Sequence, residues 1–401
     1  MKKLTSKSFD TLAVHAGERA PASDSTPTVT PIWPAVAYMY ESMDEMDAVF
    51  EGTRGGPLYL RYGSPTVSAF ENAVAILEGA EAAQAYSSGM AAIHSALLAA
   101  GAKAGTSVVA ALDVYGATFA VLNRLLTTLG VKVRMVNVND LAEVETAVKE
   151  TNATIMLVET ISNPLLKVAD VPALAELAHR NGAVLLVDNT FATPYLFNPL
   201  RYGADFAMHS ATKYLSGHGD VLAGVVAVSA ANKSKLYELN KLVGSVLGPF
   251  EAWLALRGLK TLPLRVQRQC DNAQKIAEWL CQQPRISRVN YPGLKEHAQH
   301  ALADRLFEGK GYGGVLSFEI AGADKATAFR FMEALTVCLP ATTLGDIYSL
   351  VLHPATASHR ALTDEERARV GISNGLVRLS AGIEAVEDIL ADLENALAAI
   401  G

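Results

Sequence analysis

Residues 183–190 read Ala183-Val-Leu-Leu-Val-Asp188-Asn-Thr190, and residues 204–214 read Ala204-Asp-Phe-Ala-Met-His-Ser210-Ala-Thr212-Lys213-Tyr214. Each stretch contains a short apolar run, which is typical of a strand buried on both faces, and ends in side chains that can carry chemistry. Reactive groups in an open α/β sheet collect at the carboxyl ends of its strands. We therefore expect Asp188 and Lys213 to lie close together.

Outward from these two strands, short apolar runs alternate with amphipathic stretches between residues 82 and 228. This alternation predicts an α/β fold with a mostly parallel, doubly wound sheet that helices cover on both faces. The other predicted strands are 107–112, 131–138, 154–159 and 222–228, and the predicted helices are 91–100, 119–129, 141–150 and 171–180.

The length of 401 residues exceeds one usual hydrophobic core, so we expect more than one domain. Residues 1–62 are rich in Pro, Ser and Thr and are interpreted as an extended N-terminal arm. Residues 63–258 form the predicted large domain. Residues 259–401 form a smaller C-terminal α+β domain, which closes with a helix at 383–400.

Composition and spacing exclude several classes of function. The formal net charge of −7 comes without a dense basic patch, which argues against nucleic acid as a partner. The first ten residues lack the apolar core of a signal peptide, and no stretch of eighteen apolar residues follows, so we expect a cytoplasmic protein without membrane association. Cys270, Cys281 and Cys338 are too widely spaced for a disulfide framework or a zinc site, and we expect no bound metal.

Asp188 and Lys213 are the two groups that pyridoxal 5'-phosphate (PLP) needs from a protein. A lysine amine can condense with the PLP aldehyde, and a carboxylate can keep the ring nitrogen protonated so that the ring accepts electrons. A single lysine after a strand is usually a solvated surface charge, but two preceding hydroxyl residues and the strand-terminal Asp favour the cofactor site. We therefore predict PLP as the cofactor, with Lys213 and Asp188 as catalytic residues.

A phosphate site is predicted at Ser88-Gly89-Met90, where a short apolar run leads into a helix. Small residues let backbone N–H groups approach a phosphate, and the helix dipole favours its charge. A Ser-Gly helix start alone would be an ordinary cap, so this assignment depends on the neighbouring cofactor groups. The hydroxyls of Ser210 and Thr212 are placed to hold the same phosphate.

Three further residues follow or lie within predicted strands. Tyr115 can stack on a flat cofactor ring, as aromatic side chains do. Asn163 can form a hydrogen bond with a ring hydroxyl or a substrate carboxylate. Arg378 stands in an apolar strand, where an unpaired charge is costly, and a bidentate clamp on a substrate α-carboxylate accounts for that cost.

Taken together, the ordered motifs of the chain resemble the Cys/Met-metabolism family of fold-type I PLP-dependent enzymes, also called the trans-sulfuration family. The resemblance runs from about Phe9 to the C-terminus. It rests on the motifs Tyr59-x-Arg61-Tyr-Gly63-Ser-Pro65-Thr66, Ser88-Gly89-Met90, Tyr115-Gly116-x-Thr118, Glu159-Thr-x-x-Asn163-Pro164, Val187-Asp188-Asn189-Thr190, His209-Ser-Ala-Thr-Lys213-Tyr, Arg257-Gly-Leu-Lys-Thr261-Leu, His353-Pro354-Ala355 and Arg378-Leu-Ser-x-Gly382-Ile-Glu384.

The resemblance implies that Lys213 holds the cofactor through an imine, that Asp188 contacts the ring nitrogen and that Tyr115 stacks on the ring and serves as an acid or base. Arg378 and Asn163 would hold the substrate carboxylate. The phosphate would be bound by Ser88, Gly89, Met90, Ser210 and Thr212.

Tyr59 and Arg61 match residues that reach the phosphate of a neighbouring subunit. The resemblance therefore implies a homotetramer built from two active dimers, in which the arm of each chain completes the site of its partner. The remaining partner would be a small amino-acid substrate.

Members of this family differ in their substrates. Cystathionine γ-lyases carry acidic residues at the positions aligned with Leu58 and Tyr348 and an Arg at the position of Ala120. The uncharged residues here indicate an apolar pocket suited to a short thioether such as methionine. The run Thr343-Leu-Gly-Asp346 also resembles methionine γ-lyases, and we count Thr343, Tyr59, Leu58 and Tyr348 among the substrate-binding residues.

Two departures leave alternatives open. Methionine γ-lyases usually have Cys at the position of Ala117 and a Lys-Asp pair in place of Asn240-Lys241. We predict γ-elimination on methionine or homocysteine, with γ-replacement as a cystathionine γ-synthase or O-acylhomoserine sulfhydrylase, or cystathionine γ-lyase activity, as alternatives. A catalytically idle PLP-binding protein is a remote alternative, because every expected cofactor residue is present.

Overall fold

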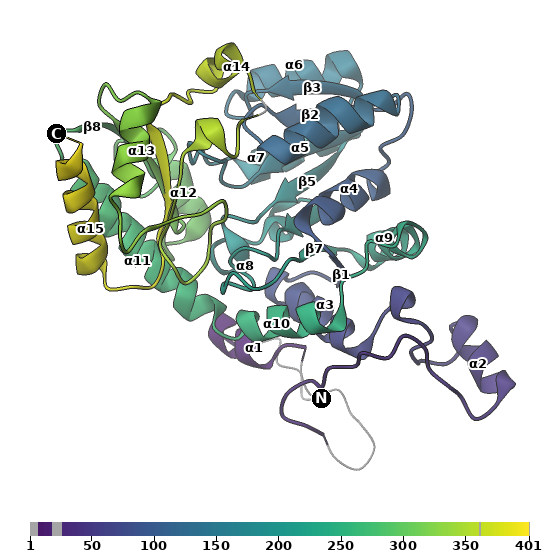
Figure 1. Cartoon of the computed structure of the whole chain (residues 1–401). Helices are drawn as coiled ribbons and strands as arrows, with labels where there is room; N and C mark the ends of the chain where they lie inside the picture. Colours follow the sequence, from purple (N-terminus) through teal and green to yellow (C-terminus); the bar gives the residue numbers. More distant parts are fainter. Residues whose placement is uncertain (1–6, 18–25, 361, 401) are drawn as a thin grey trace.

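A computed structural model describes residues 7–17, 26–360 and 362–400 (Figure 1). The larger of its two sheets has seven strands in the order β1-β7-β6-β5-β4-β2-β3. Strands β2 to β6 pair in parallel, whereas β7 runs antiparallel to both β1 and β6. The strands are β1 (Ala82–Tyr86), β2 (Ser107–Ala111), β3 (Lys132–Val136), β4 (Ile155–Glu159), β5 (Val184–Asp188), β6 (Phe206–His209) and β7 (Gly224–Val228).

Helices alternate with these strands, which confirms the predicted mostly parallel α/β class. The helices of this part are α3 (Pro65–Glu78), α4 (Gly89–Ala99), α5 (Gly116–Ala120), the π-helix η2 (Val121–Leu126), α6 (Leu141–Thr151), α7 (Val171–Arg180), α8 (Thr193–Leu196), the 3-10 helix η3 (Pro199–Tyr202), α9 (Ala230–Val243) and α10 (Pro249–Leu259).

The smaller sheet has five strands in the order β10-β11-β12-β9-β8, antiparallel except for the β10–β11 pair. It consists of β8 (Ile286–Asn290), β9 (Val315–Ile320), β10 (Leu339–Pro340), β11 (Leu350–Leu352) and β12 (Leu376–Ser380). Its helices are α11 (Leu262–Leu280), α12 (His300–Phe307), α13 (Lys325–Glu333), η4 (Pro354–Thr356), α14 (Asp364–Arg369) and α15 (Val386–Ala399).

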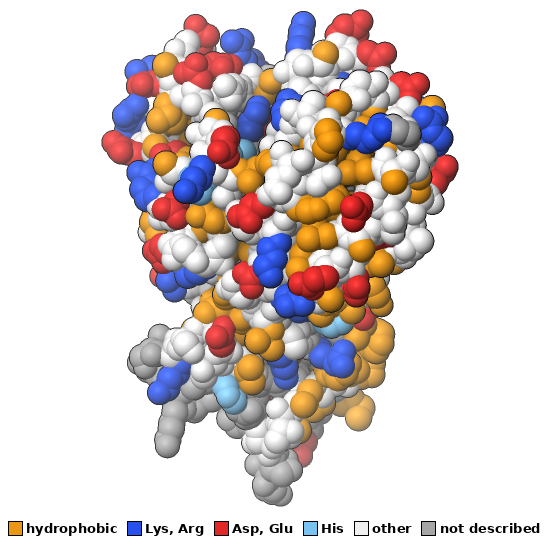
Figure 2. Space-filling view, turned by 90° about the vertical axis from the view of Figure 1, so that its left-hand side faces the viewer, with side chains coloured by type: hydrophobic (Ala, Val, Ile, Leu, Met, Phe, Trp, Pro, Cys, Tyr) orange, Lys and Arg blue, Asp and Glu red, His pale blue; other side chains and the backbone are white. Residues whose placement is uncertain are grey.

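The two larger hydrophobic cores of the described residues belong to the two sheets, and α11 contributes to both of them. Its residues Leu262 and Val266 belong to the core of the large sheet, whereas Ile276 and Leu280 belong to the core of the small sheet. The domain boundaries at residues 62 and 258 remain a proposal, since this helix joins the two cores. Over the face that Figure 2 shows, acidic and basic side chains are interspersed.

The N-terminal arm packs only partly on the rest of the chain. Helix α1 (Phe9–His15) contacts α3 and α11, whereas α2 (Met43–Phe50) stands apart from both sheets in Figure 1. The described residues do not include residues 1–6 and 18–25 of the predicted arm. Most of the N-terminal segment for which no signal peptide was predicted thus lies outside them. In the part of the chain that is described, no helix is long and apolar enough to cross a membrane.

Candidate active site

A cavity of about 400 Å³ lies where the carboxyl ends of β4, β5 and β6 face the smaller sheet. This volume is in the range of small-molecule sites in proteins. Strand β12 closes the cavity from the side of the smaller sheet through Arg378. Its lining includes ten residues that the sequence singled out, namely Ser88, Gly89, Met90, Tyr115, Asn163, Asp188, Ser210, Thr212, Lys213 and Arg378.

Lys213 lies in the turn after β6, and Thr343 holds its amine. The Nζ atom donates a hydrogen bond of 2.9 Å to the Thr343 hydroxyl. Burial, together with the positive charge of Arg378, lowers the pKa of Lys213 to about 8. An amine with this pKa is available as a neutral nucleophile and proton acceptor near neutral pH.

Asp188 ends β5 and presents its carboxylate to the cavity. The backbone N–H of Thr190, at 3.0 Å, and the Thr190 hydroxyl, at 2.5 Å, both donate to its Oδ1 atom. Burial raises the pKa of Asp188, and the two bonds from Thr190 act against that rise. A cationic ring nitrogen would strengthen the charged form further. Thr190 was not among the predicted site residues, although it follows Asp188 directly.

Glu159 is a further cavity residue that was not among the predicted site residues. It ends β4, and its Oε1 atom accepts a hydrogen bond of 2.6 Å from the backbone N–H of Tyr115. Burial and the nearby Asp188 charge raise its pKa well above the usual value. Two signals in the sequence point to Glu159, namely its strand-terminal position and its place in the motif Glu159-Thr-x-x-Asn163-Pro164. Its partner Tyr115 is 44 residues away in sequence and gives no local signal.

The predicted phosphate site combines a helix start with a close approach of two chain segments. Ser88 caps α4, and its side chain accepts a hydrogen bond of 3.1 Å from the backbone N–H of Ala91. A Cβ atom on Gly89 would lie 2.8 Å from Cβ of Ser210, so only glycine leaves the space between them open. The Thr212 hydroxyl donates to the carbonyl of Ala223 at 3.1 Å and accepts from its N–H at 3.0 Å.

Arg378 is almost fully buried, with 3% of its surface exposed. Its Nη1 atom donates to Oδ1 of Asn163 at 3.1 Å and its Nη2 atom to the carbonyl of Thr343 at 3.0 Å, whereas the buried Nε has no partner among the described residues. Burial lowers the pKa of Arg378 to about 10. A buried guanidinium in a cavity wall with an unused N–H donor is suited to binding an anionic group.

Five predicted residues are absent from the lining of the cavity within the single chain, namely Leu58, Tyr59, Arg61, Thr343 and Tyr348, although the Thr343 hydroxyl contacts the lining residue Lys213. Tyr59 and Tyr348 are exposed by 41% and 50%. Arg61 lines a separate cavity of about 180 Å³ and donates to the carbonyl of Lys241 at 2.5 Å. The structure therefore does not join the arm to the site of the same chain.

The residues of the cavity fit PLP. They present an amine with a lowered pKa, a strand-terminal carboxylate and a helix N-terminus with a gap that a Cβ atom on Gly89 would fill. These groups would hold the cofactor aldehyde, ring nitrogen and phosphate, respectively. The described residues contain no cluster of three His, Cys, Asp or Glu side chains that could hold a metal.

Comparisons with known proteins agree with this site. Residues 10–398 match the family of Cys/Met metabolism PLP-dependent enzymes. The chain is 42% identical to an L-methionine gamma-lyase of Fusobacterium nucleatum subsp. polymorphum, over 96% of this chain and 97% of that protein. It is 41% identical to an O-succinylhomoserine sulfhydrylase of Pseudomonas aeruginosa, over 99% and 97%.

Among solved structures, a putative O-acetylhomoserine (thiol)-lyase of Campylobacter jejuni that contains N'-pyridoxyl-lysine-5'-monophosphate matches with a TM-score of 0.91 and 30% identity. The match covers 98% of this chain and 100% of the other chain. PLP is therefore the cofactor of this protein, and the fold is that of the fold-type I PLP enzymes. The chain belongs to the Cys/Met metabolism family of PLP-dependent enzymes.

Proposed function

We propose that this enzyme catalyses γ-elimination on short sulfur amino acids, releasing 2-oxobutanoate, ammonia and a thiol from L-methionine or L-homocysteine. The bound PLP supplies an electron sink for the negative charge that develops on the substrate carbon atoms. The protein has to bind the substrate carboxylate, move protons at Cα and Cβ, and accommodate the sulfur substituent. These tasks can be assigned to the residues of the cavity.

The charge distribution of the cavity wall is the observation that carries the proposal. Among its lining residues, the charged ones are Glu159, Asp188, Lys213 and Arg378. Three of them are assigned to the cofactor or the α-carboxylate, and Glu159 is bonded to the backbone of Tyr115. The Oε2 atom of Glu159 has no partner among the described residues and could face an ammonium group, but no lining cation other than Lys213 and Arg378 remains to pair with the distal carboxylate of cystathionine. Leaving that carboxylate unpaired is costly.

The lysine amine is proposed as the group that takes the proton from Cα and returns protons later in the reaction. The hydrogen bond to Thr343 and the pKa of about 8 for Lys213 support this role. Asp188 is proposed to keep a proton on the cofactor ring nitrogen. Tyr115 is proposed to stack on the ring and to serve as an acid or base at the mouth of the site.

Arg378 is proposed to bind the substrate α-carboxylate together with Asn163. The free Nε atom of Arg378 and its hydrogen bond to Asn163 support this assignment. Because Thr343 accepts hydrogen bonds from both Lys213 and Arg378, the carboxylate and the proton-transfer group would be held at a fixed separation.

γ-Replacement is the second candidate, and two observations favour it. One relative is an O-succinylhomoserine sulfhydrylase at nearly the same identity as the methionine gamma-lyase. Ala117 and the pair Asn240-Lys241 depart from the pattern expected of methionine γ-lyases. Both reactions require the same groups for proton transfer at Cα, so the two candidates differ in what leaves and what enters at Cγ.

The proposal is tested by incubating the purified holoenzyme with L-methionine and measuring the products together. Equal amounts of 2-oxobutanoate, ammonia and methanethiol are expected. A second incubation with O-succinylhomoserine and a thiol tests γ-replacement. An enzyme that forms the thioether in the second reaction and no keto acid in the first would be a γ-replacement transferase.

We also propose a homotetramer of two active dimers, in which Tyr59 and Arg61 of one chain reach the phosphate site of its partner. The exposed apolar residues of the arm support this assembly, because such a surface needs a cover. They include Ile32, Trp33, Val36, Met39, Met43 and Phe50. A cytoplasmic location remains part of the proposal and rests on the sequence features given above.

A further inference from the structure

The strand ends that carry the cofactor groups have a second, fully buried face. Glu159 of β4, Asp188 of β5 and Met208 of β6 are neighbours in the sheet register, and all three line the cavity. Successive side chains along a strand point to opposite faces of a sheet. The next residue of each segment, Thr160, Asn189 and His209, therefore lies behind the cavity.

Hydrogen bonds continue the sheet ladder through Thr160 and Asn189. The Thr160 N–H donates to the Asp188 carbonyl at 3.0 Å, and the Asn189 N–H donates to the Met208 carbonyl at 2.8 Å. The alternation then returns to the cavity, because Ile161, Thr190 and Ser210 line it again. Each residue of the rear face thus sits between two residues that line the site.

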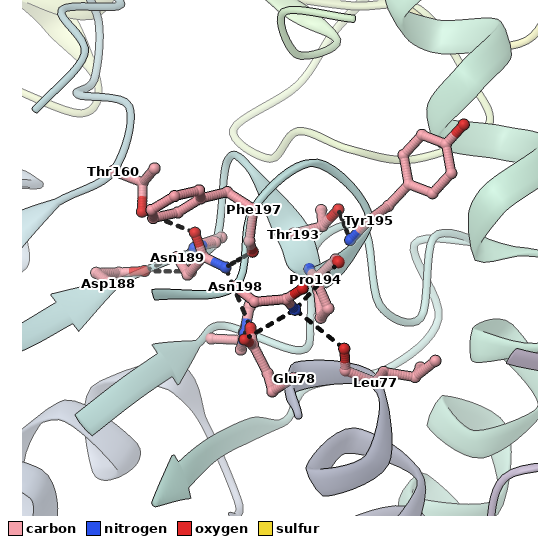
Figure 3. A network of polar contacts seen from close by, with 12 residues as sticks. Leu77, Glu78, Thr160, Asp188, Asn189, Thr193, Pro194, Tyr195, Phe197 and Asn198 are labelled. Carbon is pink, nitrogen blue, oxygen red and sulfur yellow. Dashed lines mark hydrogen bonds and ion pairs between the residues drawn. The ribbon is translucent and has the colours of Figure 1, made fainter. Parts of the chain in front are cut away.

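The side chains on the rear face form one polar network (Figure 3). The Thr160 hydroxyl donates to Oδ1 of Asn189 at 2.7 Å, and Nδ2 of Asn189 donates to Oε1 of Glu78 at 3.1 Å. The same Oε1 atom lies 2.5 Å from Nε2 of His209, and Oε2 accepts from Nδ2 of Asn198 at 3.3 Å. Three side chains thus converge on the Glu78 carboxylate.

The network is buried and expensive to break. Glu78, Thr160, Asn189 and His209 each have 0% of their surface exposed. Burying a carboxylate without hydrogen-bond donors costs several kcal/mol, so the Glu78 carboxylate needs the donors that contact it. Asn189 also donates to the carbonyl of Phe197 at 2.8 Å, which ties the loop after β5 to the same point.

We infer that Glu78 is a positioning residue for the PLP site. Its carboxylate holds Asn189 and His209, and through the backbone it sets where Asp188 and Ser210 stand on the opposite face. Glu78 is also the last residue of α3, the helix that follows Tyr59 and Arg61 in the chain. The same residue thus connects the strand ends of its own site to the arm.

The test compares three variants of the full-length enzyme. Glu78→Gln keeps the size of the side chain but turns one acceptor into a donor that faces other donors. Thr160→Val keeps the shape and removes the hydrogen bond to Asn189. Asp392→Asn is the control, because Asp392 is also buried, with 4% of its surface exposed, and accepts bonds from Thr336, Val337 and Cys338 outside the cavity lining.

Three properties are measured for each variant: the Kd of the apoenzyme for PLP, the visible circular dichroism of the bound cofactor, and the melting temperature. We expect Kd to rise at least about fivefold in Glu78→Gln and about threefold in Thr160→Val, with an altered dichroism band, since each removes a hydrogen bond of the network. The Kd of Asp392→Asn should stay within about twofold, although its melting temperature falls.

The double variant Glu78→Gln/Thr160→Val gives an independent check. Because both residues act through Asn189, its Kd should rise by less than the product of the two single effects. The inference is overturned if Kd and the dichroism band are unchanged in the folded single variants. If Glu78→Gln does not fold, Thr160→Val decides the question alone by the same criterion.

Discussion

Replacing Arg378 with lysine should weaken substrate binding while leaving the chemical step largely intact. The substitution keeps a positive charge but removes the planar fork that donates to Asn163 at 3.1 Å and to the Thr343 carbonyl at 3.0 Å. It also removes the buried Nε atom, which has no partner within the described chain. A single ammonium group cannot hold a carboxylate and both protein oxygen atoms in the same geometry.

The size of the effect follows from the hydrogen bonds that are lost. One hydrogen bond to a charged group contributes about 1.5–3 kcal/mol, which corresponds to a decrease of about 10- to 150-fold in kcat/KM. The α-carboxylate keeps its charge from the bound substrate to the transition state. The loss should therefore appear mainly as a higher KM, with kcat reduced by less than about threefold.

Steady-state kinetics on methionine measure this effect, and Arg265→Lys is the matched control. Arg265 is also buried, with 4% of its surface exposed, but it donates to the carbonyls of Tyr214 and Gly258, both at 2.8 Å. The control should lose thermal stability and keep its KM within about twofold. If Arg378→Lys itself keeps the parental KM, the assignment of Arg378 to the substrate carboxylate is wrong.

Four other predictions follow from the same site. Lys213→Ala should abolish the yellow absorbance of the holoenzyme and nearly all turnover, and a variant that retains a tenth of the parental rate would refute this. The pKa of Lys213 is lowered to about 8, so the neutral amine forms as pH increases through about 8. The rate of PLP binding to the apoenzyme should therefore rise over the same pH range, and a rise centred near pH 10 would contradict the lowered pKa. Arg61→Ala should lower PLP affinity, and mixing this variant with Lys213→Ala should restore activity, because a hybrid dimer contains one site with both residues intact. If the subunits exchange and activity does not return, the site is not shared between subunits. Leu58 and Tyr348 lie outside the cavity lining of the single chain, and the resemblance to the family assigns them to the substrate. Changing both to Glu should shift kcat/KM toward cystathionine by at least about tenfold, as measured with both substrates, and an unchanged ratio would refute that assignment.

The sequence was sufficient for strands β2 to β7 of the large sheet and for the cofactor groups, because both depend on local patterns, whereas the edge strand β1 was not assigned. Apolar runs predicted β2 to β7 to within about two residues, and the two strand-terminal groups Asp188 and Lys213 line the cavity as expected. The resemblance to the family is confirmed over residues 10–398. Helix α3 was not predicted, because most of its own residues are buried. Its polar face is therefore narrow, and hydrophobic periodicity is weak in such a helix.

Contacts between distant residues could not be read from the sequence. Tyr115 and Glu159 are 44 residues apart, and Glu78 and His209 are 131 residues apart. From sequence alone, a carboxylate at the end of a helix such as Glu78 is expected to be exposed. Only the folded structure shows the buried donors that contact it. The roles of Tyr59 and Arg61 depend on a second chain, so they stay predictions.

The substrate preference of the enzyme is given by the ratio of kcat/KM for L-methionine to that for L-cystathionine, both measured by release of 2-oxobutanoate. Because the lining cations Lys213 and Arg378 are assigned to the cofactor and to one α-carboxylate, we expect a ratio above one. A ratio below one, or the absence of keto acid from methionine while thiols are joined to an O-acylhomoserine, would refute γ-elimination on methionine as the main activity.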